Sequence, residues 1–69
     1  MTNEAIVEAG ALALYRAENS HRVQELEKRD DAQQAIAADF EMYKSRYVRK
    51  FSDVADELAL AGLAVTRAA

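Results

Sequence analysis

Several residue types are missing or rare in this 69-residue chain, and each absence excludes a class of structure or chemistry. The chain has no cysteine, which excludes disulfide bonds and thiolate metal sites. A single histidine, His21, cannot form a zinc site alone. No apolar run approaches the roughly 20 residues of a membrane-spanning helix. No basic segment precedes the first apolar stretch, which contains Glu8, so we expect no signal peptide, no membrane association and a cytoplasmic location.

The residue type that dominates instead is alanine, with 15 copies. Alanine is the best helix former, and proline, the strongest helix breaker, is absent. The chain is 51% hydrophobic, which is too apolar for a disordered segment. No Asn-Gly or Asp-Gly pair marks a β-hairpin. The composition therefore predicts a single all-α domain over residues 1–69.

The second half of the chain carries the clearest pattern, because apolar residues recur there every three or four positions. The mean period is 3.6, which is that of a straight α-helix and not the 3.5 of a supercoiled one. The members are Ile36, Phe40, Tyr43, Tyr47, Phe51, Val54, Leu58, Ala61 and Val65. This stripe predicts one long amphipathic helix from about residue 31 to residue 67.

A second apolar stripe in the first half predicts a helix over about residues 3–28. Its members are Ala5, Ala9, Leu12, Tyr15, Asn19, Val23 and Leu26. The polar Asn19 either fixes the register of a seam or marks a partly hydrated stripe.

The segment between the stripes has the features of a tight turn at residues 29–31. Asp30 and Asp31 each precede a glutamine by three residues, which is the spacing of a capping box at the start of a helix. Lys28 and Arg29 suit the end of a helix, where the macrodipole favours cations. We therefore predict an antiparallel two-helix hairpin. Three helices, with breaks at Asn19–Ser20 and at Ser52, and one long helix in a dimer are the alternatives.

The longer second helix of such a hairpin would extend past the first, and a hairpin alone encloses no interior. We therefore expect a homodimer that resembles a four-helix bundle. The residues predicted to form its core and dimer contacts are Leu12, Tyr15, Val23, Leu26, Ile36, Phe40, Tyr43, Tyr47, Phe51, Val54 and Leu58. Gly10 and Gly62, each among alanines, would permit helices to approach closely.

Apolar residues also lie off the two stripes, at both ends of the chain. Val7 and Leu14 lie on other faces of the first helix, and Leu60 and Leu63 on another face of the second. Apolar surface on two faces suggests two interfaces, of which one would bind another protein. The alternative is one compact dimer core that uses both faces.

Four basic residues cluster at Lys44, Arg46, Arg49 and Lys50. Three interpretations fit them: a solvated face, a contact for acidic groups of another protein, or a nucleic-acid site. The net charge of −3 and the acidic residues that follow argue against nucleic-acid binding. We expect Arg46 and Arg49 to meet acidic groups of a protein partner.

Enzymatic and metal chemistry have little support in the sequence. Glu18 and His21 match one Glu-x-x-His step of a di-iron bundle, but such sites need the motif twice and two more carboxylates. No catalytic triad or phosphate-binding glycine loop occurs. We expect no enzyme activity, no metal and no cofactor.

The predicted hairpin with its Asp-rich turn resembles the Rop family of plasmid copy-number regulators, through Asp30, Gln34 and Ala35. This resemblance implies a dimeric four-helix bundle that binds an RNA loop pair. The helix face that would hold RNA differs here, with Gly10, Leu14 and Glu18 in that stretch. No site residue is carried over from the resemblance.

These patterns together predict a small, non-enzymatic interaction protein that binds, and so inhibits or regulates, another protein. Phages and plasmids commonly encode such modulators of host factors. Val7, Leu14, Leu60 and Leu63 are the predicted apolar anchors, joined by Arg46 and Arg49. A structural or assembly component, a chaperone, and a Rop-like nucleic-acid regulator are the alternatives.

Overall fold

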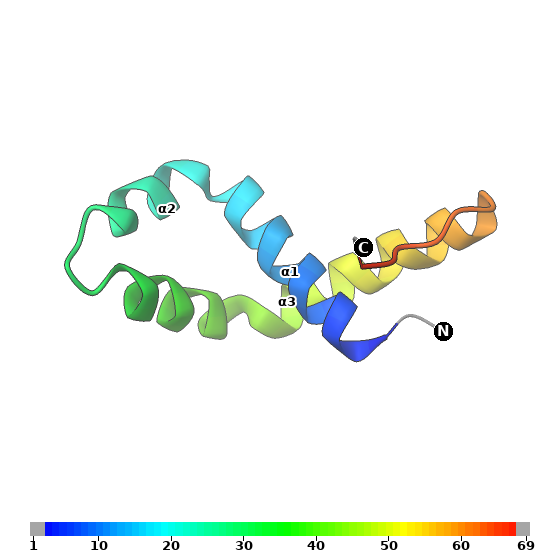
Figure 1. Cartoon of the computed structure of the whole chain (residues 1–69), viewed down its shortest axis with the longest axis horizontal. Helices are drawn as coiled ribbons and strands as arrows, with labels where there is room; N and C mark the ends of the chain where they lie inside the picture. The colour runs from blue at the N-terminus through cyan, green and yellow to red at the C-terminus, as the bar shows by residue number, and fades with distance from the viewer. Residues whose placement is uncertain (1–2, 68–69) are drawn as a thin grey trace.

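A computed structural model describes residues 3–67 of the chain as three α-helices, without a strand in that range (Figure 1). Helix α1 spans Glu4–Glu18, α2 spans Ser20–Glu27 and α3 spans Ala32–Leu60. The chain turns back after α2, and α3 then runs beside α2, crosses α1 and continues past it (Figure 1). The molecule measures 42 × 27 × 19 Å. The all-α class is confirmed. The predicted two-helix hairpin is not, because the segment expected to form one first helix is divided into α1 and α2.

Asn19 produces the break between α1 and α2. Its backbone leaves the helical region, with φ −121° and ψ 37°. Its side-chain amide donates one hydrogen bond to the backbone oxygen of Tyr15 at 2.9 Å and another to the hydroxyl of Tyr47 at 3.0 Å. Asparagine competes in this way with the helical backbone for hydrogen bonds. Of the two breaks in the three-helix alternative, the one at Asn19–Ser20 occurs, and α3 continues through Ser52 without the other.

The turn between α2 and α3 lies at residues 28–31, where 29–31 was predicted, and its capping differs from the prediction. Asp31 occupies the N-cap position of α3 without a side-chain cap hydrogen bond. Its carboxylate instead accepts two hydrogen bonds from the Arg29 guanidinium, at 2.9 and 3.0 Å. The Asp31 carboxylate is thus directed at Arg29, and the predicted capping box is not formed at Asp31.

Helix α3 ends at Leu60, so the prediction that it reaches residue 67 is wrong. Gly62 adopts the left-handed backbone conformation, with φ +83°. The N–H of Gly62 donates to the Ala59 oxygen at 3.0 Å, and the N–H of Leu63 donates to the Leu58 oxygen at 2.9 Å. This pair of bonds is a Schellman motif, which ends a helix at a glycine. Residues 63–67 then fold back along α3 towards the start of α1 (Figure 1).

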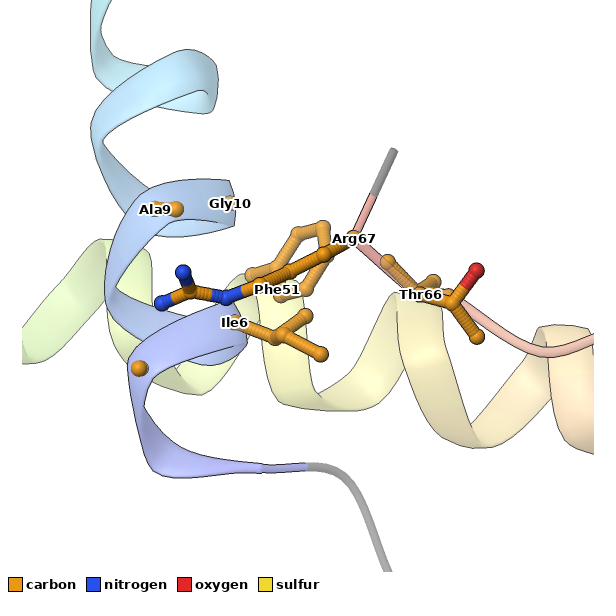
Figure 2. A pocket seen from close by; sticks show the side chains of 8 residues that line it. Ile6, Ala9, Gly10, Phe51, Thr66 and Arg67 are labelled. Carbon is orange, nitrogen blue, oxygen red and sulfur yellow. The ribbon is translucent and has the colours of Figure 1, made fainter. Parts of the chain in front are cut away.

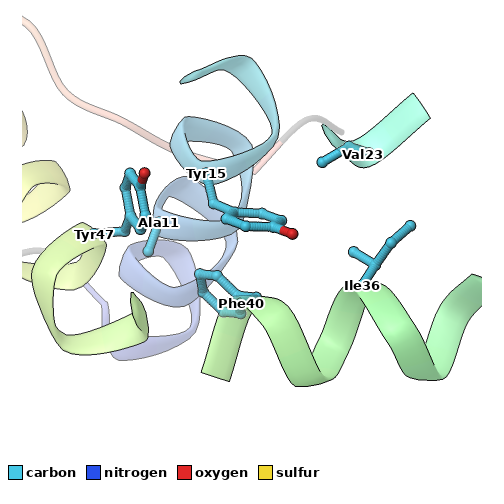
Figure 3. Close-up of a cluster of buried hydrophobic side chains, with 6 residues drawn as sticks. All are labelled: Ala11, Tyr15, Val23, Ile36, Phe40 and Tyr47. Atoms are coloured by element: carbon cyan, nitrogen blue, oxygen red, sulfur yellow. The ribbon is translucent and has the colours of Figure 1, made fainter. Parts of the chain in front are cut away.

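The buried core joins all three helices in the half of the molecule nearest the turn. Tyr15 is completely buried at its centre, and its ring lies 5.5 Å from that of Phe40 and 6.0 Å from that of Tyr47, centroid to centroid. Ala11, Val23 and Ile36 complete the cluster (Figure 3). This core fixes the first half of α3 and leaves its second half to extend past the bundle.

Candidate functional site

Large apolar side chains are exposed along α3 and just after it, and the most exposed of them, Leu60, lies at its end. Helices α1 and α3 approach closely at Gly10, where a Cβ atom would collide with the Phe51 ring. Past this point, Val54 is 44% exposed and Leu60 is 83% exposed. Leu63, just after the helix, is 58% exposed. Large apolar side chains exposed at one end of a small protein make that end a candidate interaction surface.

A groove lies beside the same crossing, between the first half of α1 and the returning residues 65–67. It has a volume of about 660 Å³ and is lined by Ile6, Ala9, Phe51 and Val65, among others. Arg67 lies across it, as Figure 2 shows. Phe51 and Val65 are half-buried, so the returning segment covers the groove only in part.

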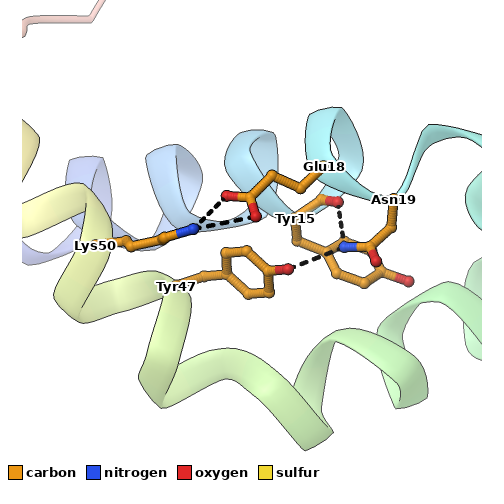
Figure 4. Close-up of polar contacts among 5 residues, drawn as sticks. All are labelled: Tyr15, Glu18, Asn19, Tyr47 and Lys50. Atoms are coloured by element: carbon orange, nitrogen blue, oxygen red, sulfur yellow. Dashed lines mark hydrogen bonds and ion pairs between the residues drawn. The ribbon is translucent and has the colours of Figure 1, made fainter.

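Two of the four clustered basic residues bind α3 to α1. The ammonium of Lys44 lies 2.9 Å from the Glu8 carboxylate, and that of Lys50 lies 2.8 Å from the Glu18 carboxylate (Figure 4). Hydrogen bonding to Glu8, helped by the charge of Glu41, raises the pKa of Lys44. Because these two ammonium groups are already paired, half of the predicted basic patch holds the fold together.

The other two basic residues, Arg46 and Arg49, are exposed and make no ion pair with any side chain in residues 3–67. The same holds for the acidic residues one and two turns further on, Asp53, Asp56 and Glu57. The outer side of α3 therefore carries charges of both signs that nothing in the described part of the chain neutralises.

The core contains a buried polar group that the sequence analysis did not identify. Asp39 is only 6% exposed, and its Oδ2 accepts a hydrogen bond from the Tyr15 hydroxyl at 2.5 Å. Its Oδ1 lies 2.8 Å from an Arg22 nitrogen, an ion pair without hydrogen-bond geometry. The only hint in the sequence is that a tyrosine in an apolar stripe needs an acceptor for its hydroxyl. This cluster links α1, α2 and α3 and is part of the fold.

Burial raises the pKa of the Tyr15 phenol to about 12, with the hydrogen bond to Asp39 and the Asp39 charge as further causes. The folded chain therefore keeps a proton that the unfolded chain releases above its ordinary pKa of 10.0. The stability that this proton contributes is complete below pH 10 and is lost as the pH rises to about 12. It amounts to at most about 3 kcal/mol, at about 1.4 kcal/mol per pKa unit.

We predict that urea unfolding midpoints fall between pH 10 and pH 12, while Tyr15 of the folded chain keeps its proton until the pH reaches about 12. A Tyr15→Phe variant carries no such proton and is expected to lose less stability over the same range. Equal losses in the two proteins would show that another group controls the alkaline transition.

The residues predicted for the core and the dimer fall into three groups in the single chain. Those that are buried are Tyr15, Val23, Ile36, Phe40 and Tyr47. Those that are half-buried are Leu26, Phe51 and Leu58. Leu12, Tyr43 and Val54 are exposed, by 37–44%. The exposed group remains open to a second chain.

The predicted partner-binding anchors do not all share one exposed surface. Leu60 and Leu63 are exposed, whereas Val7 and Leu14 are half-buried, with Leu14 packed against the core cluster. Helix α1 thus buries a face that the sequence analysis placed off its main stripe. The small residues of that face, Gly10 and the fully buried Ala11, explain why it lies against α3.

Within residues 3–67, no group of three or more acidic, histidine or cysteine side chains is arranged to hold a metal ion. None of the described helices has the length and apolarity needed to cross a membrane. No protein-family model, curated protein or solved structure gives a significant match to the chain.

Proposed function

We propose that this chain is a small, non-enzymatic interaction protein that forms a homodimer and binds another protein, which it thereby inhibits or regulates. The observation that carries the proposal is the exposure of Leu60 and Leu63, by 83% and 58%, at the end of α3 that projects past α1. Modulation of a host factor by a phage or plasmid product is the biological setting that we propose.

The proposed mechanism is the docking of this end of α3 against an apolar groove or helix of the partner. Leucine side chains that enter such a groove supply most of the binding energy, through burial of apolar surface. Arg46 and Arg49 are free of ion pairs with described side chains and would contact acidic groups at the edge. Arginine is enriched at protein interfaces because its planar group binds carboxylates with two hydrogen bonds.

The test is capture of the partner protein with immobilised wild-type chain and with Leu60→Glu/Leu63→Glu. We expect the double variant to recover at least about tenfold less partner, because two buried apolar anchors become charged. Gln33→Glu/Gln34→Glu is the matched control, since it adds the same charge at exposed positions in the first turn of α3. Undiminished recovery by a still-helical Leu60→Glu/Leu63→Glu protein would contradict the proposal.

A further inference from the structure

One exposed face of α3 has a regular pattern of its own, distinct from the apolar stripe. Its members follow one another at alternating steps of four and three residues, and all are exposed. At about 100° per residue they fall within about 80° of the helix circumference, centred half a turn away from Phe51. Phe51 points at Gly10 of α1, so this face points away from α1. The seam, as we call it, consists of Met42, Arg46, Arg49, Asp53, Asp56 and Leu60.

The seam has the spacing of the a and d positions of a heptad repeat, along which two helices pack. Its order is apolar, basic, basic, acidic, acidic, apolar. When this order is reversed about residue 51, each basic residue faces an acidic one and the two apolar residues face each other. An antiparallel second copy would place Leu60 opposite Met42, Asp56 opposite Arg46 and Asp53 opposite Arg49. A parallel copy would place arginine against arginine, which is unfavourable.

The charges of the seam are available for such pairing. None of Arg46, Arg49, Asp53 and Asp56 makes an ion pair with another side chain of residues 3–67, although Lys44 and Lys50 on the same helix both do. Both ends of the seam are also uncovered, with Met42 74% exposed and Leu60 83% exposed.

We propose that the partner of this face is a second copy of the chain, with the two α3 helices antiparallel and a two-fold axis at the level of Phe51. This inference rests on the proposed function in one respect, since it takes the exposed side of α3 as an interaction surface. It replaces the contacts proposed above for Arg46, Arg49 and Leu60 with contacts to the second copy. Leu63 and the groove beside Phe51 then remain as the surface for the other protein. An interface in which each copy uses the same patch is the common arrangement of homodimers.

Charge exchange tests the pairing in the full chain. Arg46→Glu/Arg49→Glu makes the whole seam acidic, and Asp53→Lys/Asp56→Lys makes it basic. We expect each variant alone to dimerise at least about tenfold more weakly than wild type in sedimentation equilibrium at low salt. An equimolar mixture should form a heterodimer at least as tight as the wild-type dimer, because all four cross-pairs are then of opposite sign.

The matched control is Glu4→Lys/Asp30→Lys, which changes net charge as much as Asp53→Lys/Asp56→Lys at exposed positions outside the seam. It should dimerise like wild type. Three results would each overturn the inference: a wild-type chain that stays monomeric at low salt, charge variants that dimerise normally, or a mixture that gains nothing. Circular dichroism would verify that every variant remains helical.

Cysteine cross-linking tests the direction and register of the two α3 helices. Because the chain has no native cysteine, only the introduced cysteines can form a disulfide. Met42 and Leu60 lie 18 residues apart on one helix, or about 27 Å. We therefore expect a disulfide in a mixture of Met42→Cys and Leu60→Cys chains and none in either variant alone. Self-cross-linking of each variant would show a parallel dimer, and no cross-link in the mixture would show another register.

The two proposals fail separately. Charge variants without effect, together with loss of partner capture by Leu60→Glu/Leu63→Glu, would refute the antiparallel dimer and leave the proposed function standing. Restoration of the dimer in the charge-exchanged mixture, together with normal partner capture by Leu60→Glu/Leu63→Glu, would refute the partner-binding role and leave the dimer standing.

Discussion

Replacement of Tyr15 by alanine is expected to unfold the chain. Tyr15 is the one large side chain among the described residues that is completely buried, and its ring lies between those of Phe40 and Tyr47. Truncation of a large buried aromatic side chain costs about 3–5 kcal/mol, through lost burial and the cavity that remains. Domains of this size rarely have more than about 3–5 kcal/mol of stability in total. The truncation therefore removes most or all of the free energy of folding.

The measurement is urea unfolding followed by far-ultraviolet circular dichroism, with Tyr43→Ala as the control. Tyr43 lies on the same helix as Phe40 and Tyr47 but is 40% exposed, so its truncation should cost less than half as much. Similar losses for the two variants would mean that the core does not centre on Tyr15.

The helical class and the site of the turn could be predicted because both depend on local signals. Abundant alanine and a 3.6-residue period over residues 36–58 specify a helix whatever packs against it. The end of α3 was predictable in principle but was missed. Ala61 and Val65 continue the apolar period, and that continuation hid Gly62, which ends the helix through its left-handed backbone.

The buried face of α1 could not be predicted in the same way. Residues 5–17 are apolar on almost every side, so periodicity there does not choose a face. The face of α1 that is buried is set by the close approach of Gly10 to Phe51. These two positions are 41 residues apart in the chain. Asp39 illustrates the same limit, because its burial depends on Tyr15 and Arg22 from two other helices.

The exposed seam of α3 could have been found from the sequence, since its heptad spacing and charge order are local. Residues 44–50 alone have the pattern of a basic cluster, and the acidic residues that complete the seam come after them. The structure changes that interpretation by pairing Lys44 and Lys50 within the chain while Arg46, Arg49 and the acidic residues stay unpaired.

Replacement of Asp39 by leucine is expected to destabilise the chain by about 2 kcal/mol, although leucine is apolar and favours helix. The loss arises because the completely buried Tyr15 hydroxyl would keep no acceptor, and an unsatisfied buried hydroxyl costs about 1–3 kcal/mol. Arg22 adds little to the loss, since its side chain is 60% exposed and can turn to water when the carboxylate is removed.

Tyr15→Phe/Asp39→Leu is then expected to be more stable than Asp39→Leu alone and to lie within about 1 kcal/mol of wild type, because apolar groups replace both members of the buried polar pair. Urea unfolding of the wild type, the two single variants and the double variant completes a double-mutant cycle that isolates the pair. If the free energy of unfolding falls in the double variant by the sum of its falls in the two single variants, the hydroxyl and the carboxylate contribute independently. The 2.5 Å contact between them predicts the opposite, since each group is buried and the hydroxyl has this carboxylate as its acceptor.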